Sequence, residues 1–149
     1  MISYRTVMQS TLMAAAVTLG GCGWMSSMMG SDMMSMKNQM TGAHEVPAVA
    51  TSGTGTVDTT FDKSTNVLTW TVTYSGLSGP VTAGHFHGPA SPGANAGVAV
   101  PFTGDMASPI RGKATLTAAQ AADFTAGRYY ANLHTAKNPG GEIRGQVTK

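Results

Sequence analysis

The clearest structural signal in the chain is the stretch Asn66-Val67-Leu68-Thr69-Trp70-Thr71-Val72-Thr73-Tyr74. Successive side chains of a β-strand point to opposite faces, so this alternation puts large apolar residues on one face and threonines on the other. The apolar face consists of Leu68, Trp70, Val72 and Tyr74. The pattern predicts an antiparallel strand with one buried side. Residues 55–62 precede it across a Lys63-Ser64-Thr65-Asn66 turn, which completes a predicted hairpin.

The rest of the chain repeats short strand-like runs between turns. Charged residues make up only 11% of the sequence and glycine occurs 19 times, a composition that suits a β protein. Residues 117–124 form the one predicted helix, with Thr117 as its cap and Gln120 in the capping-box position. The further strands are expected at 41–47, 81–88, 98–102, 110–116, 128–134 and 141–147. We therefore predict an all-β Greek-key sandwich or flattened barrel of about eight antiparallel strands with one short helix.

The N-terminal segment has the features of an export signal. An apolar stretch from Thr11 to Leu19 follows Arg5, and it is too short to span a bilayer. Leu19-Gly20-Gly21-Cys22 resembles the lipobox of bacterial lipoproteins. This resemblance implies a signal peptide over residues 1–21 and lipidation of Cys22, and Gly23 in place of Asp favours the outer membrane. The alternatives are an ordinary signal peptide with an unpaired cysteine, or an uncleaved membrane anchor.

Methionine dominates the segment that follows Cys22. Residues 23–40 read GWMSSMMGSDMMSMKNQM and contain seven methionines without β-branched residues. We predict a flexible Met-rich tether over 22–40, with the folded domain at 41–149. Thioether sulfurs are soft ligands that favour Cu(I), so one hypothesis is that the tether captures copper. The other is a spacer of simple composition.

Three histidines are candidates for a metal site. His85 and His87 are two residues apart in a predicted strand, so they share a face, and His134 ends another predicted strand. Two imidazoles from one strand and a third from its neighbour can gather nitrogen ligands on a rigid scaffold. The alternative is that these histidines only hydrogen-bond to loops.

Several blocks of the sequence together resemble the CHRD domain, a module first described in chordin and also found in bacterial exported proteins. The blocks are Gly42-x-x-Glu45-Val46-Pro47, residues 83–90 (AGHFHGPA), Gly127-x-Tyr129-Tyr130-x-Asn132-x-His134-Thr135 and residues 138–146 (NPGGEIRGQ). The pattern is also similar to copper/zinc superoxide dismutase, in which a His-x-His strand and a late histidine hold copper. This similarity implies copper ligands at His85, His87 and His134, with His44 as a further candidate. The zinc ligands have no counterparts in the loop 89–97.

Three polar residues are candidates for orienting the histidines through hydrogen bonds. Asn132 shares a strand face with His134, while Glu142 and Arg144 share a face of the last strand. For Asn132 the alternative is the cap of a nearby turn. For Glu142 and Arg144 it is an ordinary exposed ion pair.

Together these features predict a lipid-anchored binding protein of the cell envelope rather than an enzyme. The net charge of +2 and the lack of a Lys/Arg cluster argue against nucleic acid as a partner. No phosphate-binding loop, dinucleotide-binding turn or Ser-His-Asp signature occurs. The expected partners are the membrane, through the lipid, together with copper ions and other envelope proteins. The competing interpretation is a metal-free structural or protein-interaction module.

Overall fold

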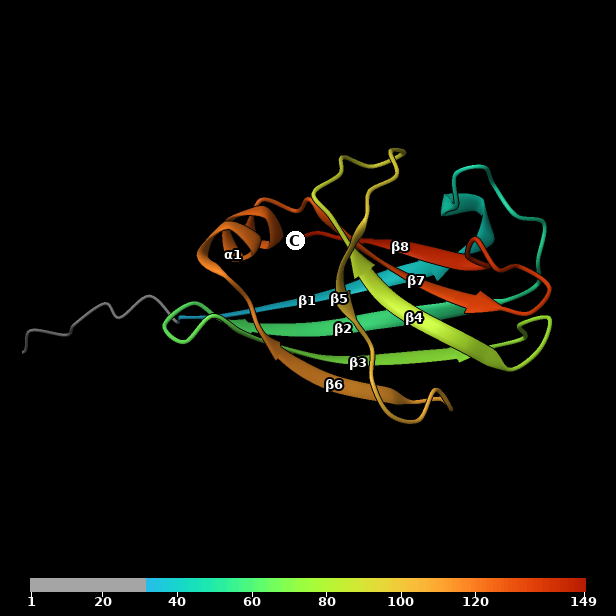
Figure 1. Cartoon of the computed structure of the whole chain (residues 1–149), viewed down its shortest axis with the longest axis horizontal. Helices are drawn as coiled ribbons and strands as arrows, with labels where there is room; N and C mark the ends of the chain where they lie inside the picture. Colours follow the sequence, from blue (N-terminus) through green and yellow to red (C-terminus); the bar gives the residue numbers. More distant parts are fainter. Residues whose placement is uncertain (1–31) are drawn as a thin grey trace, which may run out of the picture.

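The computed structural model describes residues 32–149, which form one eight-stranded antiparallel sheet and one short helix (Figure 1). The predicted all-β class is therefore confirmed. The strands are β1 (Met33–Thr41), β2 (Thr54–Asp62), β3 (Val67–Ser75), β4 (Val81–His87), β5 (Val98–Pro101), β6 (Ile110–Thr115), β7 (Tyr129–Thr135) and β8 (Ile143–Val147). A 3-10 turn, η1 (Gly42–His44), follows β1, and helix α1 (Ala118–Thr125) follows β6. The strand order is β5-β4-β7-β8-β1-β2-β3-β6.

The sheet curls into a nearly closed, flattened barrel around a single core. The predicted hairpin is present, with Leu68 of β3 opposite Phe61 of β2. Although β3 and β4 lie far apart in the strand order, Trp70 packs edge-on against Phe86 with ring centroids 5.3 Å apart. The ring of Phe102, just after β5, stacks on Trp70 at 5.2 Å. Contacts between side chains of distant strands show that the two ends of the sheet fold over each other (Figure 1).

The helix lies where its capping residues predict. The Thr117 hydroxyl oxygen accepts a hydrogen bond from the Gln120 backbone N–H, and the Gln120 side-chain oxygen accepts one from the Thr117 backbone N–H, which forms a complete capping box. Gly127 follows the helix with a φ of 73°, a backbone conformation that glycine adopts without steric cost. The buried Phe124 anchors the helix to the core, with its ring 5.4 Å from Phe61 and 5.7 Å from Tyr129.

The predicted boundary between tether and domain is wrong. Residues 33–41 form β1, which pairs with β2 along its whole length and with β8 at Thr41. Met34, Met36 and Met40 are buried in the core, at 6%, 6% and 0% exposure. An unbranched thioether side chain fills irregular core space, so these methionines serve as hydrophobic residues of a strand. The even-numbered spacing of these methionines is typical of one face of a strand, but the simple composition of the segment favoured a tether.

The strand predicted at 41–47 is also wrong. After Thr41 the chain turns into η1, in which the backbone N–H groups of Glu45 and Val49 both donate to the carbonyl oxygen of Gly42. Pro47 has no N–H to offer a neighbouring strand, which favours an irregular segment at this point. The segment from 42 to 53 instead crosses the outside of the sheet near β8, where it contributes to the site described below.

The predicted signal peptide, the predicted lipidation site Cys22 and the first part of the Met-rich segment lie outside the described residues. Within residues 32–149, no helix has the length and apolar character needed to cross a membrane.

Candidate functional site

Strands β4, β7 and β8 carry a polar outer face behind their apolar inner face. Because side chains alternate along a strand, Phe86, Leu133 and Ile143 point into the core while their neighbours point outward. The outward set consists of His85, His87, Tyr130, Asn132, His134, Arg144 and Gln146. Two loops, residues 42–53 and 88–97, hydrogen-bond to this face. Asn132 and Arg144 are consequently only 3% and 2% exposed, although both are polar.

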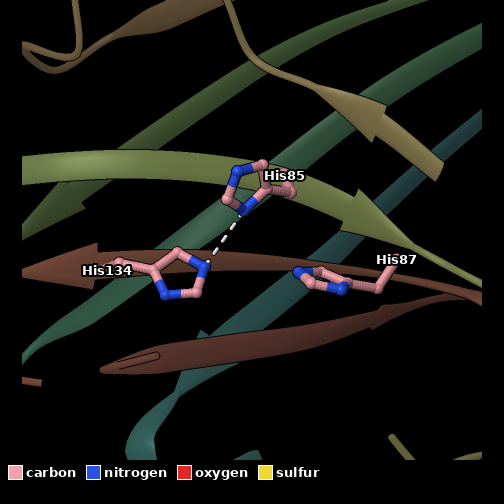
Figure 2. Close-up of side chains that lie close together, drawn as sticks. All are labelled: His85, His87 and His134. Carbon is pink, nitrogen blue, oxygen red and sulfur yellow. Dashed lines mark hydrogen bonds between the residues drawn. The ribbon is translucent and has the colours of Figure 1, made fainter. Parts of the chain in front are cut away.

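The three predicted histidines meet on this face (Figure 2). Nitrogen atoms from His85, His87 and His134 lie within 4.8 Å of one another. The nearest two are His85 Nδ1 and His134 Nε2, at 3.1 Å. A tetrahedral metal with bonds of about 2.0–2.1 Å holds its nitrogen ligands about 3.3 Å apart. The His85–His134 pair is already close to that spacing, and His87 offers a nitrogen within 4.8 Å of both.

Backbone carbonyl groups fix the orientation of two of the rings. His87 Nδ1 lies 3.0 Å from the oxygen of Ala96, and His134 Nδ1 lies 2.9 Å from the oxygen of Pro139. A carbonyl oxygen only accepts hydrogen bonds, so in the neutral rings each Nδ1 carries the proton and each Nε2 keeps its lone pair. His87 Nε2 is buried and has no hydrogen-bond partner within residues 32–149. This is the arrangement of a metal-binding imidazole held in place through its other nitrogen.

His85 completes the cluster through its Nδ1. Since His134 Nε2 accepts, the hydrogen bond of 3.1 Å is donated by His85 Nδ1 when no metal is present. A metal ion placed between these two atoms would replace that proton, and His85 would then carry its proton on Nε2. Such an exchange needs no rearrangement of the strands.

Burial keeps two of the rings in the uncharged form that binds metals. Loss of hydration lowers the pKa of His85, and the neighbouring His134 and His87 lower it further. Loss of hydration likewise lowers the pKa of His87, against the opposing hydrogen bond to Ala96. Metals bind the neutral imidazole, so protons compete less with a metal here than at an exposed histidine.

A stack of side chains extends from the histidines across the face. The ring of Tyr130 lies parallel to that of His87, with centroids 4.9 Å apart. The guanidinium carbon of Arg144 lies 3.4 Å from the centroid of Tyr130, a cation–π contact. Because β7 lies between β4 and β8, Tyr130 separates His87 from Arg144. Arg144 also donates to Asn95 Oδ1 and to the oxygen of Ala94, which fastens the loop 88–97 over the stack.

Glu45 is a functional candidate that the sequence analysis did not single out. Its side chain is buried, and loss of hydration raises its pKa to about 7 despite a hydrogen bond from Asn132 and the charge of Arg144. Asn132 Nδ2 donates to Glu45 Oε1 at 3.0 Å. A side chain at Gly141 would collide with both, since its Cβ would lie 2.1 Å from Asn132 Nδ2 and 2.6 Å from Glu45 Oε1. In the sequence, the only feature that pointed to Glu45 was its place in the first block of the CHRD resemblance.

Other predicted site residues lie elsewhere than expected. His44 is not part of the histidine cluster, and its Nδ1 lies 3.2 Å from the backbone oxygen of Arg144. Asn132 bonds to Glu45 rather than to His134. Glu142 does not pair with Arg144; it is fully buried and accepts hydrogen bonds from Thr51, Ser78 and Thr135. Arg144 contacts the cluster indirectly, through Tyr130.

The chain was also compared with known proteins. A family model described as the CHRD domain matches residues 36–147. The match covers most of the chain and includes residues 36–41 of β1, in agreement with a domain that begins before Thr41. No curated protein and no solved structure matches the chain.

Proposed function

We propose that this protein, which belongs to the CHRD domain family, binds a transition-metal ion through His85, His87 and His134. The observation that carries the proposal is the convergence of three imidazoles, two of them oriented by backbone carbonyl groups. Imidazole nitrogen suits copper, zinc, nickel and iron, and among divalent ions of this series copper binds a given nitrogen site most tightly. Copper is therefore the favoured ion.

The proposal assigns the three buried methionines of β1 no part in metal binding. Met34, Met36 and Met40 are buried in the core, so their sulfur atoms are not accessible ligands. The domain would bind copper through nitrogen alone. Nitrogen ligands accommodate Cu(II), whereas a thioether-rich site would favour Cu(I).

The test is a copper titration of the full chain and of two variants. We expect about one tightly bound equivalent in the wild type, because the three nitrogens form one site, and loss of this binding in the His85→Ala/His87→Ala variant. His44→Ala is the matched control, since His44 lies outside the cluster, and it should bind as the wild type does. Circular dichroism verifies that each variant is folded. Equal binding by the double variant and the wild type would reject the site.

A metal-free interaction module is the second candidate function. The hydrogen bonds of His87 to Ala96 and of His134 to Pro139 favour it, because they fasten loops without any ion. The two functions differ in their response to a chelator. An ion that binds only the native state stabilises it, so removal lowers the melting temperature of a metal protein and leaves that of a metal-free module unchanged.

We further propose that lipid on Cys22 holds the protein on a membrane of the cell envelope. Only residues 23–32 separate Cys22 from β1, and at about 3.5 Å per residue this segment spans at most about 35 Å. The domain would thus stay close to the membrane surface. Fractionation of cells should find the wild type with membranes and Cys22→Ser in the soluble fraction, because acyl chains supply the anchoring free energy. Equal membrane association of the two proteins would contradict the anchor.

A further inference from the structure

A partly enclosed cavity of about 470 Å³ lies beside the histidine cluster, on the other side of Tyr130 and Arg144. Its floor includes the outer face of β8, at Arg144 and Gln146, and its walls are η1 with the following residues and the tip of the loop 88–97. The volume falls within the range of small-molecule sites. The metal proposal does not use this cavity, and none of the three clustered histidines lines it.

One charged group of the cavity is a buried cation. Arg144 is 2% exposed, and no carboxylate forms an ion pair with it within residues 32–149. Its guanidinium donates through Nη1 to Asn95 and through Nη2 to Ala94. A guanidinium has five N–H donors, so three remain for another acceptor. A carboxylate is the group that this geometry accepts best.

An acidic group lies in the same cavity, and a ligand ammonium group beside it would favour its ionised form. Glu45 lines it and uses Oε1 to accept from Asn132, while no hydrogen bond within the described residues reaches Oε2. Gln146 also lines the cavity, and its Nε2 donates to the backbone oxygens of Ala90 and Gly127, which hold its side chain in place.

Apolar residues complete the lining. Ala43, Val46 and Pro92 contribute to the walls, and Val46 is 38% exposed at the mouth. The cavity thus combines a guanidinium group, a carboxyl group and an apolar wall.

From this combination we infer that the cavity binds a zwitterionic α-amino acid with an apolar side chain. Arg144 would hold the carboxylate, Glu45 would accept from the ammonium group, and Val46 with Pro92 would contact the side chain. The pairing is specific because the ligand must carry both charges.

Calorimetric titration of the full chain with leucine, N-acetylleucine and leucinamide tests the inference. N-acetylleucine lacks the ammonium group and leucinamide lacks the carboxylate. We expect saturable binding of leucine and at least about tenfold weaker binding of each analogue, because each leaves a charged group unpaired. Glu45→Gln should weaken leucine binding, while the surface control Asp58→Asn should not.

Three results would overturn the inference that the cavity binds a zwitterionic amino acid. These are no saturable binding of leucine in the millimolar range, equal binding of leucine and N-acetylleucine, and equal binding of leucine and leucinamide. The wild-type comparison of the three probes decides the question even if a variant fails to fold. The outcome is independent of metal binding by the histidines.

Discussion

The two halves of the sheet have similar inner faces and very different outer faces. On β2 and β3 the outer face is exposed and carries simple cross-strand pairs, such as Thr56 with Thr73 and the Lys37–Asp58 ion pair that reaches β2 from β1. On β4, β7 and β8 the outer face is covered by two loops and holds buried polar residues with few spare partners. Burying polar groups costs free energy unless they are satisfied. The covered half bears that cost, so we place the function there.

Strand β1 joins the two halves of the sheet, because it pairs with both β8 and β2. Met40 is fully buried at this junction. We expect Met40→Ala to destabilise the protein by about 2–5 kcal/mol, the usual cost of a large-to-small change in a core. Urea unfolding monitored by tryptophan fluorescence measures this loss of unfolding free energy. A cost near zero would mean that residues 33–40 belong to a tether after all.

Glu142 is a buried carboxylate whose contribution to stability can be compared with that of an exposed one. It accepts hydrogen bonds from Thr51, Ser78 and Thr135, and bonds with these hydroxyl groups and the Ser78 backbone lower its pKa to about 2 against the cost of burial. We expect Glu142→Gln to cost about 2–3 kcal/mol, since charge-assisted bonds are lost and a hydroxyl is left unpaired. Asp58→Asn, in an exposed pair, is the control and should cost under about 1 kcal/mol. If urea unfolding gave the same loss of unfolding free energy for Glu142→Gln and Asp58→Asn, the buried carboxylate would not differ from the exposed one.

The same carboxylate predicts a pH dependence with a definite sign. The folded-state pKa of Glu142 is below the ordinary value of 4.5, so its contribution to stability is present above pH 4.5 and is lost as the pH falls towards about 2. In the Glu142→Gln variant this acid-dependent part of the unfolding free energy should be missing.

Glu45 should show a pH dependence of the opposite sign. Its folded-state pKa is raised to about 7, so the native state holds a proton that the unfolded chain releases above pH 4.5. Stability is therefore lost as the pH rises from 4.5 through 7. As the pH rises from about 5 to about 8, the melting temperature of the Glu45→Gln variant should increase relative to that of the wild type. A constant difference over this range would contradict the raised pKa.

The sequence predicted the parts of the molecule that depend on local pattern. The alternation from Leu68 to Tyr74 determined the β hairpin, and the Thr117–Gln120 capping box located the helix. The shared face of His85 and His87 follows from strand geometry alone. Their meeting with His134 depends on the pairing of β4 with β7, which the structure shows.

The remaining parts depend on contacts that no local pattern encodes. Met34 and Met36 alternate as strand residues do, yet methionine has little strand preference, so composition pointed to a tether. Glu45 and Arg144 acquire their roles only when the loops 42–53 and 88–97 cover the sheet. Glu142 was placed near the histidines because it shares a face with Arg144, whereas its partners come from three distant segments.

X-ray absorption spectroscopy of the copper-loaded full chain tests the central claim most directly, because it reports the atoms bound to the metal. We predict three imidazole nitrogens in the first coordination sphere at about 2.0 Å, unchanged in His44→Ala and absent in His85→Ala/His87→Ala. A coordination sphere without imidazole, or one that persists in the double variant, would contradict the claim that these three histidines form a metal site.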